Sequence, residues 1–235
     1  MVSENPPYQL RVAIHRGHEI LQYLLDPVDH EMRNAADSID LMARHPVLLV
    51  HGIDDTAALF HRMTPYLERG GWSVHTLSLV PNNGEAALRE LAQQLDARIR
   101  ATFTMDEAIH LVGFSMGGLI SRYYIQRLGG IHRVRKFVTI GTPHRGTWTA
   151  FLRANPGARD MRPGSAFLKD LNRDIEMLAS LSFASIWTPF DLMIVPANSS
   201  QVPVGRSIPV RTLAHPLLVR DPQVFELVLG ILSAG

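Results

Sequence analysis

Short apolar runs alternate with longer segments of helical periodicity along the chain from His45 onward. Several of these runs are almost wholly apolar, as strands buried on both faces of a sheet must be. Strands that alternate with helical segments build a parallel sheet covered by helices. The pattern therefore predicts an α/β fold with a mostly parallel central sheet of about six strands, flanked by helices. The predicted strands are residues 47–50, 73–79, 109–112, 134–140, 184–187 and 210–212.

Three helices are predicted between and after these strands. Apolar residues recur at helical spacing at Leu88, Leu91, Leu95 and Ile99. This stripe predicts an amphipathic helix whose apolar face packs on the sheet. A second helix should follow residue 115 and stop at Gly129-Gly130, because glycine commonly ends a helix. Pro222 should open the last one, since proline is tolerated in the first turn of a helix.

Two further parts of the chain lie outside this alternation. Residues 12–43 carry two amphipathic stripes that are broken at Asp26-Pro27. They predict an N-terminal helical extension over residues 1–44, packed on a main domain of residues 45–235. The polar face of the extension mixes both charges, which favours packing over a partner-binding or membrane-surface role. Residues 146–183 form a long segment between late strands and predict a short helical, cap-like insertion.

Composition narrows the classes of function. The chain has 235 residues, of which 46% are hydrophobic and 19% charged, and this suits one folded α/β unit. Its 23 basic and 22 acidic side chains leave a net charge of +1, which gives no electrostatic footprint for nucleic acid and favours neutral substrates. The absence of cysteine excludes a cysteine nucleophile, a disulfide framework and a thiolate metal site.

Targeting signals are not apparent in the chain. Its first residues lack the basic and apolar regions of a signal peptide, and no apolar run is long enough to span a membrane. As written, the chain is expected to be cytoplasmic, although a precursor trimmed to this length would look the same. The sequence leaves the oligomeric state open.

A nucleophile motif occupies residues 113–118 (GFSMGG), between the strand predicted at 109–112 and a helix. In a GxSxG elbow the serine hydroxyl is raised on a sharp strand-to-helix turn, and that turn leaves no room for a Cβ two residues to either side. Gly113 and Gly117 meet this requirement, and Gly118 would let the helix sit close to the sheet. The motif in this context predicts Ser115 as a nucleophile.

The end of the first predicted strand supplies a candidate oxyanion loop. The strand runs into His51-Gly52-Ile53, and a serine hydrolase needs a backbone N–H from this loop to hold the oxyanion of the tetrahedral intermediate. We expect the N–H groups of Ile53 and Met116 to act together. Gly52 would let the loop approach Ser115, and His51 is expected to hold the loop in place.

These segments resemble those of bacterial triacylglycerol lipases and related esterases of the α/β-hydrolase superfamily. The resemblance rests on the His51-Gly52 step, on residues 113–118 and on residues 141–147 (GTPHRGT). It implies the α/β-hydrolase fold, and it implies that residues 141–147 border the acyl pocket. His144, within that segment, is expected to be structural.

In that superfamily the catalytic residues follow the chain order serine, acid, histidine. His215 is the only histidine after residue 144, and it is therefore the predicted base. Asp191 lies just beyond the strand predicted at 184–187, in an acid, apolar pair and proline pattern that resembles the family's. Four other aspartates precede that strand or follow the histidine, and they are expected to be solvated or capping residues: Asp160, Asp170, Asp174 and Asp221.

The chemistry predicted for this set is cleavage of a carboxylic ester of moderate acyl length, as in a lipase or esterase. His215 would remove the proton of Ser115, Asp191 would orient the imidazolium, and water would release the acyl-enzyme. The same triad serves a thioesterase, an amidase or a deacylase of phospholipids or lipid anchors, and these alternatives stay open. A non-catalytic relative that only binds is a further alternative, which the retained serine, acid and histidine disfavour.

Four bulky residues of the insertion are candidates for the wall of an acyl pocket: Trp148, Phe151, Phe167 and Leu168. Burial against the sheet would leave the same pattern in the sequence. No acidic cluster lies between Asp191 and His215, so neither a metal nor another cofactor is predicted. The expected partner is a small-molecule or lipid ester, met through a transient contact with a lipid interface, and no nucleic acid is expected.

Overall fold

The computed structural model of the chain describes residues 44–234. From His45 onward the residues belong to one compact unit. The helical extension predicted over residues 1–44 lies outside the described residues, apart from Arg44.

A six-stranded sheet forms the centre of this unit, in the order β2-β1-β3-β4-β5-β6. Every neighbouring pair of strands runs parallel, so the predicted parallel sheet is confirmed. All residues of β3 are buried, and its carboxyl end reaches the edge of the sheet at which α/β proteins bind ligands. The strands are β1 (Val47–Val50), β2 (Val74–Leu77), β3 (Ile109–Phe114), β4 (Val134–Ile140), β5 (Ser182–Trp187) and β6 (Arg206–Pro209).

The position predicted for the sixth strand is wrong. The strand is Arg206–Pro209 rather than residues 210–212, although the N–H of Val210 still donates to the carbonyl of Trp187 at 2.8 Å. β6 is an edge strand with one neighbour, and most of its residues are exposed. An apolar run marks only strands that are buried on both faces, so it does not reveal a polar edge strand.

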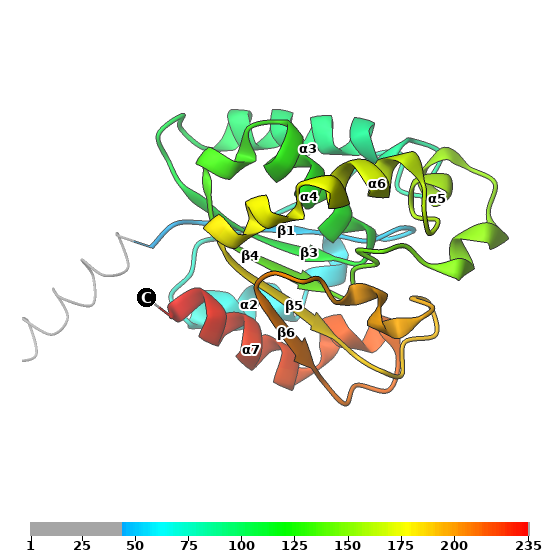
Figure 1. The fold of residues 1–235 in the computed structure, drawn as a ribbon. Helices are drawn as coiled ribbons and strands as arrows, with labels where there is room; N and C mark the ends of the chain where they lie inside the picture. Colours follow the sequence, from blue (N-terminus) through cyan, green and yellow to red (C-terminus); the bar gives the residue numbers. More distant parts are fainter. Residues whose placement is uncertain (1–43, 235) are drawn as a thin grey trace, which may run out of the picture. The chain divides into compact units, whose positions relative to one another are not determined.

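Helices cover both faces of the sheet (Figure 1). The helices α3, α4, α5 and α6 lie over one face, and α2 and α7 lie over the other. Side chains alternate along β1, so that Leu48 and Val50 join the core of the first face while Val47 and Leu49 join that of the second. The α-helices are α2 (Met63–Arg69), α3 (Leu88–Thr102), α4 (Met116–Arg127), α5 (Pro156–Asp160), α6 (Ala166–Arg173) and α7 (Pro222–Ser233). The short 3₁₀ helices are η1 (Ala57–Phe60), η2 (Gly130–His132), η3 (Trp148–Leu152), η4 (Ile175–Ser180), η5 (Ala197–Ser200) and η6 (His215–Arg220).

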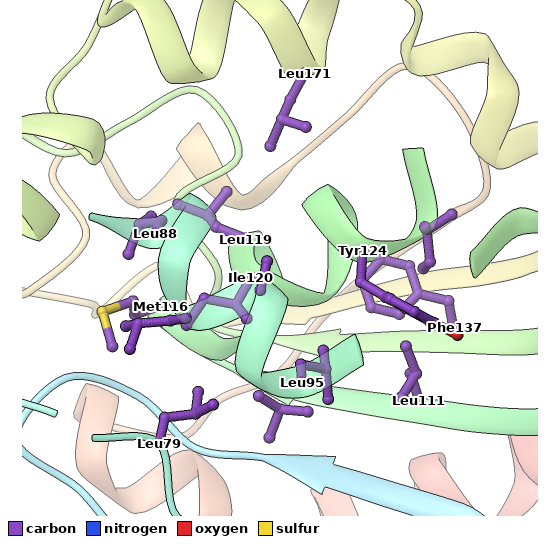
Figure 2. Packing of buried hydrophobic residues seen from close by; sticks show 14 of the residues in the cluster. Leu79, Leu88, Leu95, Leu111, Met116, Leu119, Ile120, Tyr124, Phe137 and Leu171 are labelled. Atoms are coloured by element: carbon purple, nitrogen blue, oxygen red, sulfur yellow. The ribbon is translucent and has the colours of Figure 1, made fainter. Parts of the chain in front are cut away.

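The core of the first face holds α4 firmly on the sheet (Figure 2). Leu119 and Ile120 of α4 pack with Leu95 of α3 and with Leu111 and Phe137 of the sheet, all in one cluster without solvent exposure. Full burial of one such side chain contributes roughly 1.5–3 kcal/mol to stability. Ser115 is the residue immediately before α4, so it is attached to a helix that is held rigidly on the sheet.

The three predicted helices are confirmed as α3, α4 and α7. α3 begins at Leu88, the first residue of the predicted stripe. α4 ends at Arg127, and Gly129 then takes the left-handed conformation, with φ of 82°. α7 begins at Pro222, and the Asp221 side chain accepts a hydrogen bond from a backbone N–H of its first turn.

The segment 146–183 contains η3, α5, α6 and η4. The side chains of Asn155 and Ser165 cap α5 and α6, which explains where these short helices start. Within residues 44–234, no helix is both long and apolar enough to cross a membrane.

Candidate active site

Ser115 stands at the junction of β3 and α4 with a strained backbone, at φ of 51° and ψ of −121°. A non-glycine residue in this region persists only where its surroundings hold it. The Ser115 N–H donates to the Ile140 carbonyl at 2.8 Å, and its carbonyl accepts from the Thr142 hydroxyl at 3.0 Å and from the Gly118 N–H at 3.1 Å. These bonds keep Ser115 on a sharp turn at the carboxyl end of the central strand.

The glycines of the motif are required by close backbone contacts. A Cβ on Gly117 would lie 2.2 Å from the Val50 carbonyl oxygen and 2.4 Å from that of His51. A Cβ on Gly113 would lie 2.5 Å from the Gly118 Cα. The obstacles are backbone atoms, so a side chain at either glycine would displace β1 or α4 rather than a flexible neighbour.

We expect Gly117→Ala to lower the free energy of unfolding by about 3 kcal/mol, because its Cβ would overlap the backbone of β1. Gly230→Ala is the matched control, since Gly230 lies in α7, is exposed, and has no atom within 4 Å of its Cβ position. There alanine should raise stability by about 0.5–1 kcal/mol. Urea unfolding of both variants measures the contrast, and an equally stable Gly117→Ala would contradict the packing described for the turn.

A buried carboxylate and imidazole pair lies beyond the later strands. The Nδ1 of His215, at the start of η6, is 2.6 Å from Oδ2 of Asp191, which follows β5, and both side chains are at most 3% exposed. The other carboxylate oxygen, Oδ1, accepts the backbone N–H groups of Met193 and Ile194 at 2.9 and 2.8 Å. The carboxylate is thus fixed on both oxygens, and a proton on Nδ1 of His215 is the tautomer that this pairing favours.

The imidazole of His215 packs against residues that adjoin Ser115. Its ring centroid lies 4.8 Å from that of Phe114, the residue before the serine. A Cβ on Gly141, just after β4, would lie 3.0 Å from the His215 Cε1. The Nε2 of His215 is buried and has no hydrogen-bond partner among residues 44–234. The structure therefore brings the three predicted residues, Ser115, Asp191 and His215, to one edge of the sheet.

The loop after β1 borders the same place. Ile53 lines a pocket together with Ser115, and the next N–H, that of Asp54, donates to the Asn82 carbonyl at 2.8 Å. Met116 is buried at the first position of α4, where a backbone N–H has no acceptor inside the helix. Both predicted oxyanion residues thus flank Ser115.

His51 holds this loop in place, as expected. Its Nδ1 is 2.8 Å from the Gly52 carbonyl, and its Nε2 accepts the N–H of Leu79 at 2.9 Å. Burial lowers the pKa of His51 below its usual value. The neutral ring is the form that can accept at Nε2, so the histidine ties β1 to the segment after β2.

Arg122 of α4 was not predicted, although it is fully buried. Its guanidinium donates to the Leu171 carbonyl at 2.9 Å and the Asn172 side chain at 3.0 Å, and its Nη1 is 3.4 Å from Nδ1 of His144. His144 also pairs with the Thr139 hydroxyl at 3.0 Å, and burial lowers its pKa well below the usual value. His144 is structural, as expected, and Arg122 joins the elbow helix to α6 and to the loop after β4.

The four aspartates set aside by chain order all have other partners. Asp160 accepts the first N–H of α3 at 2.9 Å. Asp170 and Asp174 bind Arg127 at 2.8 and 2.9 Å. Asp221 caps α7. None of them pairs with a histidine in the described part of the chain, which leaves Asp191 as the carboxylate that does.

A pocket of about 290 Å³ opens beside Ser115, and its wall is mostly apolar. Its size is at the lower end of small-molecule sites. The residues that line it are Ile53, Ser115, Thr147, Thr149, Ala150, Leu152, Arg153, Ala158, Met161, Leu192, Met193 and Ile194.

The four residues predicted for the pocket wall do not line it. Phe167 and Leu168 are 3% and 1% exposed and belong to the core under α6. Trp148 and Phe151 stack on each other at the surface, with ring centroids 5.4 Å apart. Ala150, from the same 3₁₀ helix, lines the pocket instead. Large apolar residues can be recognised in a sequence. Which of them faces the pocket from a short helix depends on tertiary packing.

The part of the chain that carries Ser115 matches a known protein family. The model of the family described as palmitoyl protein thioesterase matches residues 46–190, which is more than half of the chain. The chain belongs to the palmitoyl protein thioesterase family. The match includes Ser115 and the loop after β1, and it stops one residue before Asp191. For this family member, the assignment of Asp191 and His215 to the site therefore rests on their order in the chain and on the contact between their side chains.

Curated relatives of this palmitoyl protein thioesterase family member include thioesterases and lipases. The lysosomal thioesterase PPT2 of Mus musculus is 28% identical over 109 residues, which cover 44% of this chain and 35% of the relative. A triacylglycerol lipase of Pseudarthrobacter phenanthrenivorans is 32% identical over 113 residues, which cover 44% and 34%. The aligned part thus spans about a third of the length of these relatives.

Solved structures share the fold at low sequence identity. The lipase BlEst2 of Bacillus licheniformis in its mature form has a TM-score of 0.71 at 15% identity, covering 82% of this chain and 93% of that one. Lipase B of Aspergillus fumigatus also has a TM-score of 0.71, at 17% identity, covering 81% of this chain and 53% of that one. The predicted α/β-hydrolase fold is therefore confirmed.

Across residues 44–234, no three or more histidine, cysteine, aspartate or glutamate side chains gather as they would around a metal ion. What the arrangement offers is a strained serine, a buried imidazole paired with a carboxylate, and two residues beside the serine, Ile53 of the loop after β1 and Met116 at the start of α4.

Proposed function

We propose that the chain is a serine hydrolase that cleaves acyl esters, with thioesters as the second candidate, through an acyl-enzyme intermediate. The observation that carries the proposal is the buried pair of His215 and Asp191 at the same sheet edge as the strained Ser115. In acyl transfer, an activated serine needs a base held in one tautomer and a site for the oxyanion.

Each group has a role in this proposal. The Nε2 of His215 takes the proton of Ser115 as the oxygen attacks the acyl carbonyl, and Asp191 stabilises the imidazolium through Nδ1. The N–H groups of Ile53 and Met116 bind the oxyanion, and His215 then protonates the leaving alcohol or thiol. Water repeats the two steps on the acyl-enzyme and releases a carboxylic acid.

The substrate class is an apolar acyl chain of moderate length. Leu152, Met161 and Leu192 contribute to a largely apolar wall beside Ser115, and this supports an acyl group rather than a charged one. Leu152 and Leu192 are also 85% and 84% exposed, which supports a transient contact with a lipid interface when the substrate is a lipid.

A thioester is the second candidate for the reactive bond, next to the oxygen ester. The observation in its favour is the match to the palmitoyl protein thioesterase family, together with the relationship to a lysosomal thioesterase. A series of nitrophenyl esters and a series of acyl-coenzyme A thioesters with the same chain lengths would separate the two bond types. If the protein hydrolysed neither the esters nor the thioesters, and if fluorophosphonate formed no adduct on Ser115, the proposal would be contradicted.

The pocket predicts how chain length is selected. Ala150 lines it and is 6% exposed, so Ala150→Leu would place added methyl groups inside the cavity. We expect kcat/KM for the longest accepted acyl chain to fall about tenfold or more relative to acetyl, since a few methylenes in an apolar pocket discriminate to this extent.

Ala97→Leu is the matched control for this change, because Ala97 lies on the exposed face of α3. It should leave the ratio of long-chain to acetyl activity unchanged. An Ala150→Leu enzyme with the chain-length profile of the parent would show that the acyl group binds elsewhere.

A further inference from the structure

A second carboxylate stands beside the candidate site, in the loop that follows β1. Asp55 comes two residues after Ile53, and its Oδ2 lies 3.1 Å from the position that a Cβ on Gly52 would take. The Ser115 Cβ is also 3.1 Å from that position, and the Phe114 ring is 3.3 Å from it. The bare backbone of Gly52 thus lets the carboxylate and the serine become neighbours.

The imidazole of His215 contacts the same group of residues through Phe114. Its ring packs on Phe114 at 4.8 Å between centroids, and a positive charge on this ring would lower the pKa of the Asp55 carboxyl. Three other charged or titratable groups act on the Asp55 carboxyl: His51 after β1, the neighbouring Asp54, and Arg220 at the end of η6.

The carboxylate of Asp55 is held in place without being neutralised. Its residue is anchored through the backbone carbonyl, which accepts from the Asn82 side chain at 2.6 Å. Within residues 44–234, neither a hydrogen bond nor an ion pair reaches the carboxylate itself. Burial raises the pKa of Asp55, and the two histidines counteract the rise. Asp55 is neither buried nor fully exposed, and its carboxylate is a negative charge close to Ser115 without a bonded partner among the described residues.

We propose that Asp55 is a positioning residue of the catalytic centre, whose negative charge stabilises the imidazolium that forms on His215. The inference rests on the proposed function. Asp191 fixes the tautomer of His215 through a direct hydrogen bond, and Asp55 acts from the Ser115 side through charge alone. The two carboxylates together favour transfer of the serine proton to His215.

Asp55→Asn removes the charge and keeps the shape. We expect kcat to fall about tenfold with little change in KM, because the lost interaction is made only when the imidazolium forms. The acid limb of kcat/KM against pH should also move to lower pH, since protonated His215 is then less stabilised. A purely structural Asp55 would leave that limb where it is.

Asp54→Asn is the matched control. Asp54 has φ of 60°, a conformation that asparagine also tolerates, and its half-exposed carboxylate pairs with Arg153. Its charge is screened by solvent, so the acid limb should not move. Circular dichroism and a melting curve would establish that each variant is folded. Asp55→Ser provides a second neutral variant, for which the same downward shift of the limb is expected.

The outcomes separate this inference from the proposed function. An active parent enzyme whose two neutral Asp55 variants keep the parent's acid limb and kcat would overturn the role of Asp55 alone. A rise in kcat would also overturn it, because it would mean that the carboxylate mainly opposes the oxyanion. A folded parent without activity on any ester or thioester would instead overturn the proposed function.

Discussion

Replacing Ser115 with alanine will lower kcat for every ester and thioester by about 10⁴-fold or more, because the reaction loses the oxygen that attacks the carbonyl. The fold should survive the change. Alanine and serine both carry a Cβ, so the strained backbone at φ of 51° costs about the same for either, and the bonds that hold it involve only the backbone atoms of residue 115.

Mass spectrometry after treatment with a fluorophosphonate tests the same prediction directly. The parent should carry one adduct on Ser115, and Ser115→Ala should carry none. Ser121→Ala is the matched control, since Ser121 is a buried serine of the same helix whose hydroxyl donates to the Gly117 carbonyl at 2.8 Å. It should keep activity within a few fold and keep the adduct. Substantial turnover by Ser115→Ala would remove Ser115 from the mechanism.

The parts of this site that could be predicted from the sequence are those set by local chemistry. The turn at Ser115 needs glycine at 113 and 117 because backbone atoms lie within 2.5 Å of the missing Cβ positions, and such a requirement is written into a short motif. The parallel sheet followed from apolar runs, since its inner strands are buried on both faces. The pairing of Asp191 with His215 was predicted from chain order, which reflects the order in which parallel strands deliver their loops to one edge.

The parts that could not be predicted depend on packing between distant segments. The edge strand β6 is polar because one of its sides has no neighbour, so its sequence resembles a loop. The pocket is lined by Ala150 rather than by its bulky neighbours Trp148 and Phe151, and only the fold decides which of them faces inward. Asp55 lies four residues after His51 in the sequence, and nothing in that spacing places its carboxylate beside Ser115.

The hydrogen bonds of Asp191 make Asp191→Asn the second large expected effect. Oδ1 accepts two backbone N–H groups, from Met193 and Ile194, so in asparagine the amide oxygen must take that place. The amide NH₂ then faces Nδ1 of His215, which must become an acceptor and leave its proton on Nε2. A protonated Nε2 cannot take the proton of Ser115, and we expect kcat to fall about 10⁴-fold with KM little changed.

The opposite orientation of the asparagine would restore the tautomer only at a cost. Its NH₂ group would then oppose the N–H groups of Met193 and Ile194, and leaving the buried Ile194 donor unpaired would alone cost about 1–3 kcal/mol. Asp221→Asn is the matched control, because the Asp221 carboxylate accepts from α7 and from the Thr212 hydroxyl rather than from His215, and asparagine caps helices equally well. It should keep full activity. If folded Asp191→Asn retained more than a tenth of the parent's kcat, the tautomer of His215 would not depend on this carboxylate, and another acid would have to serve the base.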